Sequence, residues 1–406
     1  MDDFFKEIDG MENLVIEIQK GLTAIPAINP ENGGDGEYEK FLFLRKLIGS
    51  WGFDSLEEFL VPDDRVKSKM RPSLIATING KVEQKLWIIT HLDVVPPGEE
   101  ALWDNSPYNA VVKNGRIYGR GVEDNQQSLV SSLLAAKTIL DNKIKPHYTV
   151  KLFFIADEEV GSDKGIKWFL ENNNFFSKDD LIMTPDGGEP SGKTIEIAEK
   201  SILWIMFKVL GKQSHGSRPD KGINSQRAAS HLCIRLDDML HAKYNGTDPV
   251  YDIPVSTFEP TRRYNNVANM NTIPGEEHLG FDCRILPCYR LSDVIDDIDV
   301  VSKEIEKQSG VKIETDIIQN LQAPAPTPPD AGIVRLIQKS VNKLRGFIPQ
   351  PIGIGGGTVA AYLRMKGYHA ALWSTIDMTM HSPNEYSIIK NTMDDAKVFL
   401  DMMMGE

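Results

Sequence analysis

The chain has 406 residues, too many for one ordinary hydrophobic core, so its length predicts about two domains. Apolar residues make up 41% and charged residues 25% of the sequence, the balance of a folded soluble protein. The 45 basic and 58 acidic side chains give a net charge of −13, and no concentrated basic stretch offsets it. This charge disfavours a nucleic-acid or anionic-membrane partner and is compatible with cation binding.

Cysteine content and the first residues indicate the compartment. Three cysteines are few, odd in number and not spaced as a zinc knuckle, so a reducing cytoplasm is expected. The segment that begins Met1-Asp2-Asp3 has neither the basic nor the apolar region of a secretory signal. No uncharged apolar run approaches the ~18 residues of a membrane span, so no membrane partner is expected.

The first part of the chain predicts an α/β domain. Residues 1–51 are predicted to be helical, with a Pro- and Gly-containing loop at 29–36. Strands and helices then alternate, with strands at 74–78, 86–90, 148–156 and 181–183, and helices at 128–140 and 165–172. This alternation is typical of a largely parallel sheet with helical crossovers.

The pattern changes near residue 200. The predicted elements are a strand at 201–210, a helix at 225–240, strands at 264–271 and 277–284, a helix at 291–307 and a strand at 311–318. This is the split βαβ pattern of a small independent layer, and it ends at a proline-rich linker, 324–329. Because the remainder returns to the first pattern, we expect one domain from 1–200 and 320–406, interrupted by an inserted domain at 201–319.

Acids and histidines stand at the ends of the predicted strands. His91 and Asp93, in residues 90–98, follow an apolar run, and strand ends in an open α/β sheet converge on one crevice. A metal-bound imidazole usually donates its other N–H to a carboxylate, so His91 and Asp93 fit a ligand and its supporting acid. The alternative is a buried histidine satisfied by a nearby carboxylate.

Three further strings carry carboxylates. Asp124, in residues 119–124, suits a bridge between two cations or, alternatively, a helix cap. Glu158 and Glu159 follow an apolar strand and suit one metal ligand and one base for water, or else a solvated strand end. Asp186 lies in Pro-Asp-Gly-Gly, which is also strong turn chemistry.

A late histidine completes a set that suits two zinc-like ions. His381, in residues 380–385, is a ligand candidate only because the set otherwise lacks a second nitrogen. Two histidines and three carboxylates form a nitrogen and oxygen ligand set, and Glu158 is left for proton transfer.

Two other strings have open interpretations. Residues 355–358, Gly-Gly-Gly-Thr, suit an anion or a close approach of substrate, or an ordinary turn; they lack the lysine of a phosphate-binding loop. His215 is either a functional residue of the inserted domain or a surface histidine.

In this order, the five strings resemble the zinc peptidase and deacylase family of succinyl-diaminopimelate desuccinylase, acetylornithine deacetylase, glutamate carboxypeptidase, aminoacylase and the bacterial dipeptidases. The resemblance runs over roughly residues 15–400. It implies that His91 and Asp186 bind one metal, that Glu159 and His381 bind the other, and that Asp124 bridges them. It also implies that Asp93 orients His91 and that Glu158 is the general base.

The resemblance extends to the inserted domain. His215 matches a histidine that polarises the scissile carbonyl from the partner subunit in dimeric members. Asn271 and Arg284 match residues that hold the carboxylate end of the substrate. Gly356 and Gly357, from the glycine string after the inserted domain, are expected to bind substrate. The implied fold is a zinc-exopeptidase α/β domain with a mostly parallel sheet, carrying an inserted ferredoxin-like lid and dimerisation domain.

The function expected from this resemblance is hydrolysis of an amide bond in a small peptide or N-acyl amino acid. The expected cofactors are two Zn²⁺ per chain, with Co²⁺ or Mn²⁺ as substitutes, and the expected assembly is a homodimer. Departures from the desuccinylase branch, such as Val359-Ala360-Ala361 after the glycines, leave the substrate open. The alternatives are a catalytically silent metal-binding scaffold on the same fold and a metal-dependent phosphoesterase.

Overall fold

The structure is a computed structural model that describes residues 1–405, and this part of the chain divides into two compact units. The first unit comprises Met1–Ile197, Thr327–Pro351 and the chain from Thr358 onward. The second comprises Ala198–Pro326 and Ile352–Gly357. Within the described residues, no helix is both long and apolar enough to cross a membrane.

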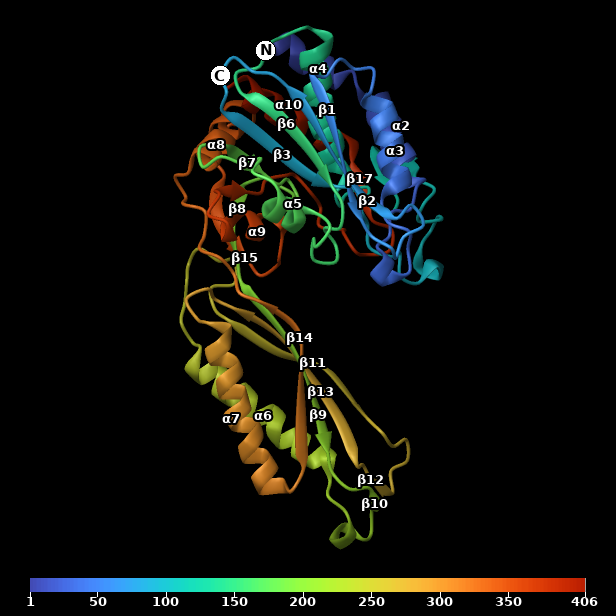
Figure 1. Cartoon of the computed structure of the whole chain (residues 1–406), viewed down its shortest axis with the longest axis vertical. Coiled ribbons are helices and arrows are strands. Elements are labelled where there is room, and N and C mark those ends of the chain that lie inside the picture. The colour runs from blue at the N-terminus through green and yellow to red at the C-terminus, as the bar shows by residue number, and fades with distance from the viewer. Residues whose placement is uncertain (406) are drawn as a thin grey trace. The chain divides into compact units, whose positions relative to one another are not determined.

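The first unit is built on a mixed, mostly parallel sheet (Figure 1). In spatial order its strands are β1 (Ser55–Pro62), β2 (Met70–Ile78), β6 (Thr149–Ile155), β3 (Lys85–His91), β7 (Leu181–Met183) and β16 (Ala370–Ala371). Strands β6, β3, β7 and β16 run parallel, whereas β2 and β1 extend the sheet in antiparallel fashion. The predicted α/β class is confirmed. The sequence missed β1 because its edge position leaves most of its residues partly or fully exposed.

Helices cover both faces of this sheet. They are α1 (Asp2–Asp9), α2 (Glu12–Thr23), α3 (Tyr38–Ile48), α4 (Gln126–Asp141), α5 (Ile166–Asn172), α8 (Gly332–Arg345), α9 (Val359–Met365) and α10 (Ile389–Met404). Trp87 and Ile89 of β3 pack with Phe169 of α5 and Leu363 of α9 in one core cluster. Consecutive residues of β3 are buried because the sheet is covered on both sides.

Several short strands lie outside the main sheet. A small sheet contains β4 (Val111–Lys113), β5 (Arg116–Tyr118) and β17 (Tyr386–Ile388), and β8 (Thr194–Glu199) pairs with β15 (Gln350–Ile354). Two of these strands, β8 and β15, run from residues of the first unit into residues of the second. The pairing of β17 with β5 joins the region before α4 to the region before α10.

The second unit is a four-stranded antiparallel sheet with two helices. Its elements are β9 (Ser201–Leu210), α6 (Ser225–Lys243), β11 (Thr257–Asn265), β13 (Glu276–Ile285), α7 (Leu291–Ser309) and β14 (Lys312–Leu321). The spatial order β11-β13-β9-β14 follows the split βαβ arrangement. Apolar residues of α6 and α7 share one core with the sheet, and a two-stranded ribbon, β10 (Ser214–His215) and β12 (Thr272–Ile273), extends from it.

The predicted strand at 264–271 is wrong. The strand that pairs with β13 is β11, Thr257–Asn265, in register from Thr257 opposite Arg284 to Asn265 opposite Glu277. Pro260 obscured it, since proline is excluded from most strands but tolerated at an edge or a bulge. β11 is an edge strand, and its register shifts between Pro260 and Arg262.

A buried ionic cluster surrounds Arg71, near the start of strand β2. Arg71 of β2 is fully buried and pairs with Glu37, with Asp157 at 3.0 Å and with Asp63 at 3.5 Å. Its guanidinium also donates to the side-chain oxygen of Asn29. Removing one partner of a buried ion pair is costly because the remaining charges keep their desolvation penalty.

We predict that Arg71→Met lowers the free energy of unfolding by about 3–5 kcal/mol, since it leaves buried carboxylates without their cation. The matched control is Arg45→Met, which removes a half-exposed arginine paired with the partly exposed Glu58. Its cost should stay below about 1 kcal/mol. Urea unfolding followed by circular dichroism measures both, and equal shifts in the two variants would contradict the assignment.

Candidate metal centre

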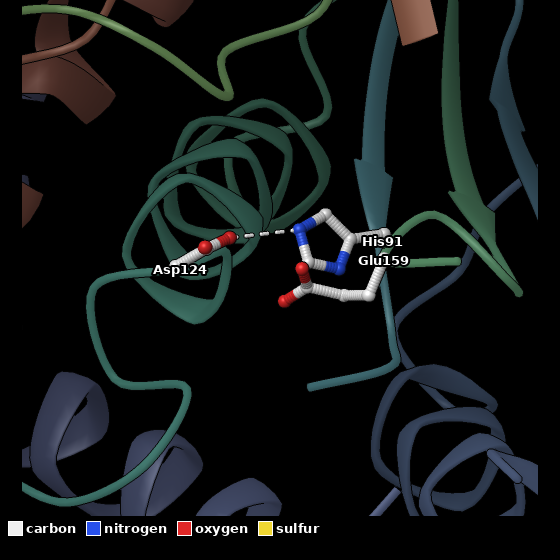
Figure 2. A group of neighbouring side chains, drawn as sticks. All are labelled: His91, Asp124 and Glu159. Carbon is white, nitrogen blue, oxygen red and sulfur yellow. Dashed lines mark hydrogen bonds and ion pairs between the residues drawn. The ribbon is translucent and has the colours of Figure 1, made fainter. Parts of the chain in front are cut away.

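The predicted ligands gather where the parallel strands of the first unit end. His91 is the last residue of β3, Glu159 follows β6, and Asp186 follows β7. Asp124 lies in the turn before α4, and His381 lies in the loop between β16 and β17. Figure 2 shows three of these side chains, His91, Asp124 and Glu159, converging from separate elements.

The distances between these side chains are short. Nε2 of His91 lies 2.9 Å from Oδ1 of Asp124 and 3.4 Å from Oδ1 of Asp186. Nε2 of His381 lies 3.2 Å from Oδ2 of Asp124 and 3.3 Å from Oε2 of Glu159. The structure therefore brings all five predicted ligands together. Donor atoms lie within 4.8 Å of one another in two groups, His91 with Asp124 and Glu159, and His91 with Glu158 and Asp186.

Asp93 supports the centre through hydrogen bonds to its backbone and to His91. Its fully buried carboxylate accepts hydrogen bonds from the backbone N–H groups of Glu158 (3.1 Å) and Glu159 (3.0 Å) and from Nδ2 of Asn29 (2.7 Å). Nδ1 of His91 lies 3.5 Å from Oδ1 of Asp93 and 3.0 Å from the backbone oxygen of Asp93. Asp93 thus fixes one ring nitrogen of His91 and leaves Nε2 facing the carboxylates.

The carboxylates share the space with the two imidazoles, and their pKa values reflect this. Burial opposes protonation of His91, but the carboxylates of Asp186 and Asp124 outweigh it and raise the pKa of His91 well above its usual value. Hydrogen bonds with Asp124 and Glu159 raise the pKa of His381 to about 10. Burial, with the charge of Asp124 next, raises the pKa of Glu159 to about 7. Burial and then the charge of Asp186 raise the pKa of Glu158 well above its usual value.

The donor set fits divalent cations. Imidazole nitrogens and carboxylate oxygens are the ligands that zinc, cobalt and manganese accept. In residues 1–405, the ion-pair partners of Asp124, Glu159 and Asp186 are imidazoles alone, with no lysine or arginine among them. The cluster therefore holds more negative charge than the protein neutralises, which is the condition for binding a cation.

Sequence reasoning missed the groups that hold these side chains. Nδ2 of Asn125 donates to Oδ1 of Asp186 at 2.8 Å and to the backbone oxygen of Pro185 at 2.9 Å. Asn29 links Asp93 to Arg71. Asn125 directly follows Asp124, and Asn29 is the first residue of the loop predicted at 29–36. Neither stretch of sequence indicates which side chains these asparagines contact.

The remaining predicted site residues lie in the second unit. His215 is exposed on β10, and its neighbour Gly216 donates its N–H to the backbone oxygen of Asn271 at 2.7 Å. Arg284 of β13 donates to both oxygens of Asp282, at 2.7 and 3.0 Å, and to the backbone oxygen of Gly355 at 3.0 Å. Gly356 and Gly357, which follow Gly355, are exposed. The guanidinium fork is therefore already paired with a carboxylate of the chain.

Fold and site define a class, the metal-dependent hydrolases of amide or peptide bonds built on an α/β domain with an inserted α+β domain. Comparison with known proteins narrows the class. Residues 87–405 match the model of Peptidase family M20/M25/M40, and the chain belongs to this family.

Individual relatives agree with this family. An uncharacterized metallohydrolase of Methanococcus maripaludis is 39% identical over 96% of this chain and 98% of its own. A succinyl-diaminopimelate desuccinylase of Nitratiruptor is 24% identical over 91% of this chain and 94% of its own. Among solved structures, a tripeptidase of Staphylococcus aureus is similar with a TM-score of 0.76, at 20% identity, covering 97% of this chain and 98% of that one.

We predict that metal binding at pH 7 releases protons and weakens as the pH falls. Because the pKa of His381 is raised to about 10, its imidazole is protonated at pH 7 without metal. The pKa of Glu159 is raised to about 7, so its carboxyl group is partly protonated at that pH. Both side chains must lose these protons before they can bind a metal ion. Isothermal titration with Zn²⁺ in two buffers of different ionisation enthalpy measures the release. His381→Ala should release fewer protons, and heats that do not depend on the buffer would contradict the prediction.

Proposed function

We propose that this protein uses two divalent metal ions, Zn²⁺ in the first instance, to hydrolyse an amide bond in a small peptide or N-acyl amino acid. The observation that carries the proposal is the position of Asp124. Its Oδ1 faces His91 at 2.9 Å and its Oδ2 faces His381 at 3.2 Å. A carboxylate with each oxygen toward a different imidazole is suited to bridge two ions.

The proposed ligand assignment follows from the remaining contacts. Asp186 lies beside His91 at 3.4 Å, so these two would hold one ion with Asp124. Glu159 lies beside His381 at 3.3 Å, so these two would hold the other. Asp93, hydrogen-bonded behind His91, would orient the imidazole and increase its basicity.

Two bound cations would supply Lewis acidity, which lowers the pKa of a water molecule and draws electron density from the substrate carbonyl. Glu158 is the proposed general base, because it is the carboxylate near His91 and Asp186 that the ligand assignment leaves unused. Burial raises its pKa, which makes the carboxylate a stronger proton acceptor. Glu158 would take the proton of the attacking water and pass it to the leaving amine nitrogen.

His215 is proposed to stabilise the negative charge that develops on the carbonyl oxygen. The backbone N–H of Ser217 donates to Nδ1 of His215 at 3.1 Å, and the Ser217 hydroxyl lies 2.8 Å from the same nitrogen. With Nδ1 accepting, the neutral ring carries its proton on Nε2, where it can donate to an oxyanion. We further propose that the chain is a homodimer and that His215 serves the partner subunit's site.

The substrate class is proposed on chemistry and on relatives. Arg284 and Asn271 are proposed to bind the carboxylate end of the substrate, and the exposed Gly356 and Gly357 are proposed to contact the substrate. A carboxylate that docks on Arg284 must share the guanidinium with Asp282, whose two oxygens already accept from it. One solved structure of similar fold is a tripeptidase and one curated relative is a desuccinylase, so we propose both peptides and N-acyl amino acids as candidate substrates. The cytoplasmic location stays a prediction.

We predict that Glu158→Gln lowers kcat by at least about 100-fold, the usual contribution of a general base, while two metal ions remain bound. The amide keeps the shape of the side chain but does not accept the proton. Elemental analysis gives the metal content and steady-state kinetics give kcat, with Glu171→Gln on the exposed face of α5 as the matched control. Loss of metal together with activity would count against Glu158 as the base.

The test of the function itself is amide hydrolysis by Zn²⁺- or Co²⁺-loaded protein. Two panels are compared, one of dipeptides and one of N-acyl amino acids that includes N-succinyl-diaminopimelate. The expected result is activity on one panel that EDTA removes and added metal restores. Inactivity on both panels with two metals bound would favour the silent scaffold, and activity only on phosphate esters would favour the phosphoesterase.

A further inference from the structure

Two loops of the first unit carry Asp124 and His381, and each loop places a buried glutamate against the backbone of the other. Glu123 directly precedes Asp124, and Glu385 follows His381 by four residues. Both glutamates are buried, with 3% and 0% of their surface exposed. Buried carboxylates need hydrogen-bond donors to offset lost hydration, so the donors they use are informative.

Glu385 receives its donors from the Asp124 loop. Its Oε1 accepts from the backbone N–H groups of Glu123 at 2.9 Å and Asp124 at 3.2 Å. Its Oε2 accepts from the backbone N–H of Gly121 at 3.1 Å and from the buried guanidinium of Arg120. A single side chain therefore holds the loop before α4, including the peptide N–H of the proposed bridging residue.

Glu123 receives its donors from the His381 loop. Its Oε1 accepts from the backbone N–H of Asp377 at 2.7 Å. Its Oε2 accepts from the backbone N–H of Thr379 and from the Thr379 hydroxyl at 2.8 Å. Thr379 lies two residues before His381, which adopts a positive φ of 61°, uncommon for a residue other than glycine. The loop thus has a fixed anchor close to the imidazole it presents.

The two sets of contacts are reciprocal, and they join segments that are far apart in the sequence. Asp124 and Glu385 are separated by 261 positions, and Glu123 and Thr379 by 256. Between them lies the contact of Oδ2 of Asp124 with Nε2 of His381 at 3.2 Å. In Figure 2, Asp124 stands on the loop that enters α4, which is the segment that Glu385 holds.

We propose that Glu123 and Glu385 form a reciprocal carboxylate clamp that sets the spacing of Asp124 and His381. This spacing would set the affinity for the second metal ion, the one assigned to Glu159 and His381. They are positioning residues, since neither is assigned to an ion or to substrate. The inference rests on the proposed ligand roles of Asp124 and His381. A purely structural role would instead affect stability and leave metal binding unchanged.

The experiment compares metal binding by Glu123→Gln and Glu385→Gln with that of the wild type. Zn²⁺ affinity is measured by competition with a chromophoric chelator, and the visible spectrum is recorded after two equivalents of Co²⁺. The control is Asp180→Asn. Asp180 is a buried acid before β7, at the ends of the strands opposite the metal centre. Its carboxylate accepts hydrogen bonds from Nε1 of Trp87 at 2.8 Å and from the backbone N–H of Ser177 at 2.9 Å. Thermal unfolding of the metal-free proteins reports stability separately.

The expected result is a loss of about 10- to 100-fold in affinity for the weaker-bound Zn²⁺ in each clamp variant, with an altered Co²⁺ spectrum. Asp180→Asn should keep wild-type affinity and spectrum. The double variant should lose less than the product of the two single losses, because the glutamates close the same pair of loops. If the glutamine variants do not fold, Thr379→Val, which removes one donor to Glu123, should weaken binding, and Thr379→Ser should restore it.

Wild-type affinity and an unchanged Co²⁺ spectrum in the clamp variants would overturn the clamp while leaving the proposed function intact. Wild-type protein that binds fewer than two ions would overturn the dinuclear centre and the clamp together. The two failures are therefore distinguishable by the wild-type titration alone.

Discussion

Repulsion among partly buried carboxylates is the constraint on which the rest of the first unit depends. Asp124, Glu158, Glu159 and Asp186 approach one another at the ends of the parallel strands, where their partial burial strengthens their mutual repulsion. Two imidazoles offset part of this charge by holding protons, as the raised pKa values of His91 and His381 indicate. Cations would displace those protons and neutralise the cluster. Backbone amides, Asn29, Asn125 and the clamp glutamates then hold the ligands in place.

Part of this centre could be predicted from the sequence because His91, Glu159 and Asp186 end or closely follow strands of the parallel sheet, whereas Asp124 lies in the turn before α4. The apolar run before His91 marks β3, and the run before Glu158 marks β6. Strand ends in a parallel sheet meet at one edge, so residue types placed there indicate a common site without knowledge of any contact. His381 was a further exception, since it was included only because the set needed a second nitrogen.

The supporting residues could not be predicted, because their roles exist only in long-range contacts. Nothing near Arg71 in the sequence indicates that it meets Glu37 and Asp157. Glu123 and Glu385 lie inside the recognised strings, but their partners are more than 250 positions away. Pro260 hid strand β11 for a different reason, since an edge strand tolerates a residue that local propensity excludes.

Anomalous diffraction from a Zn²⁺-loaded crystal tests the central claim most directly, because it locates each ion against named side chains. The account predicts two peaks, one within about 2.0–2.2 Å of donor atoms of His91 and Asp186 and the other within that distance of Glu159 and His381. Asp124 should contact both. A single peak, or two peaks that Asp124 does not join, would contradict the dinuclear centre.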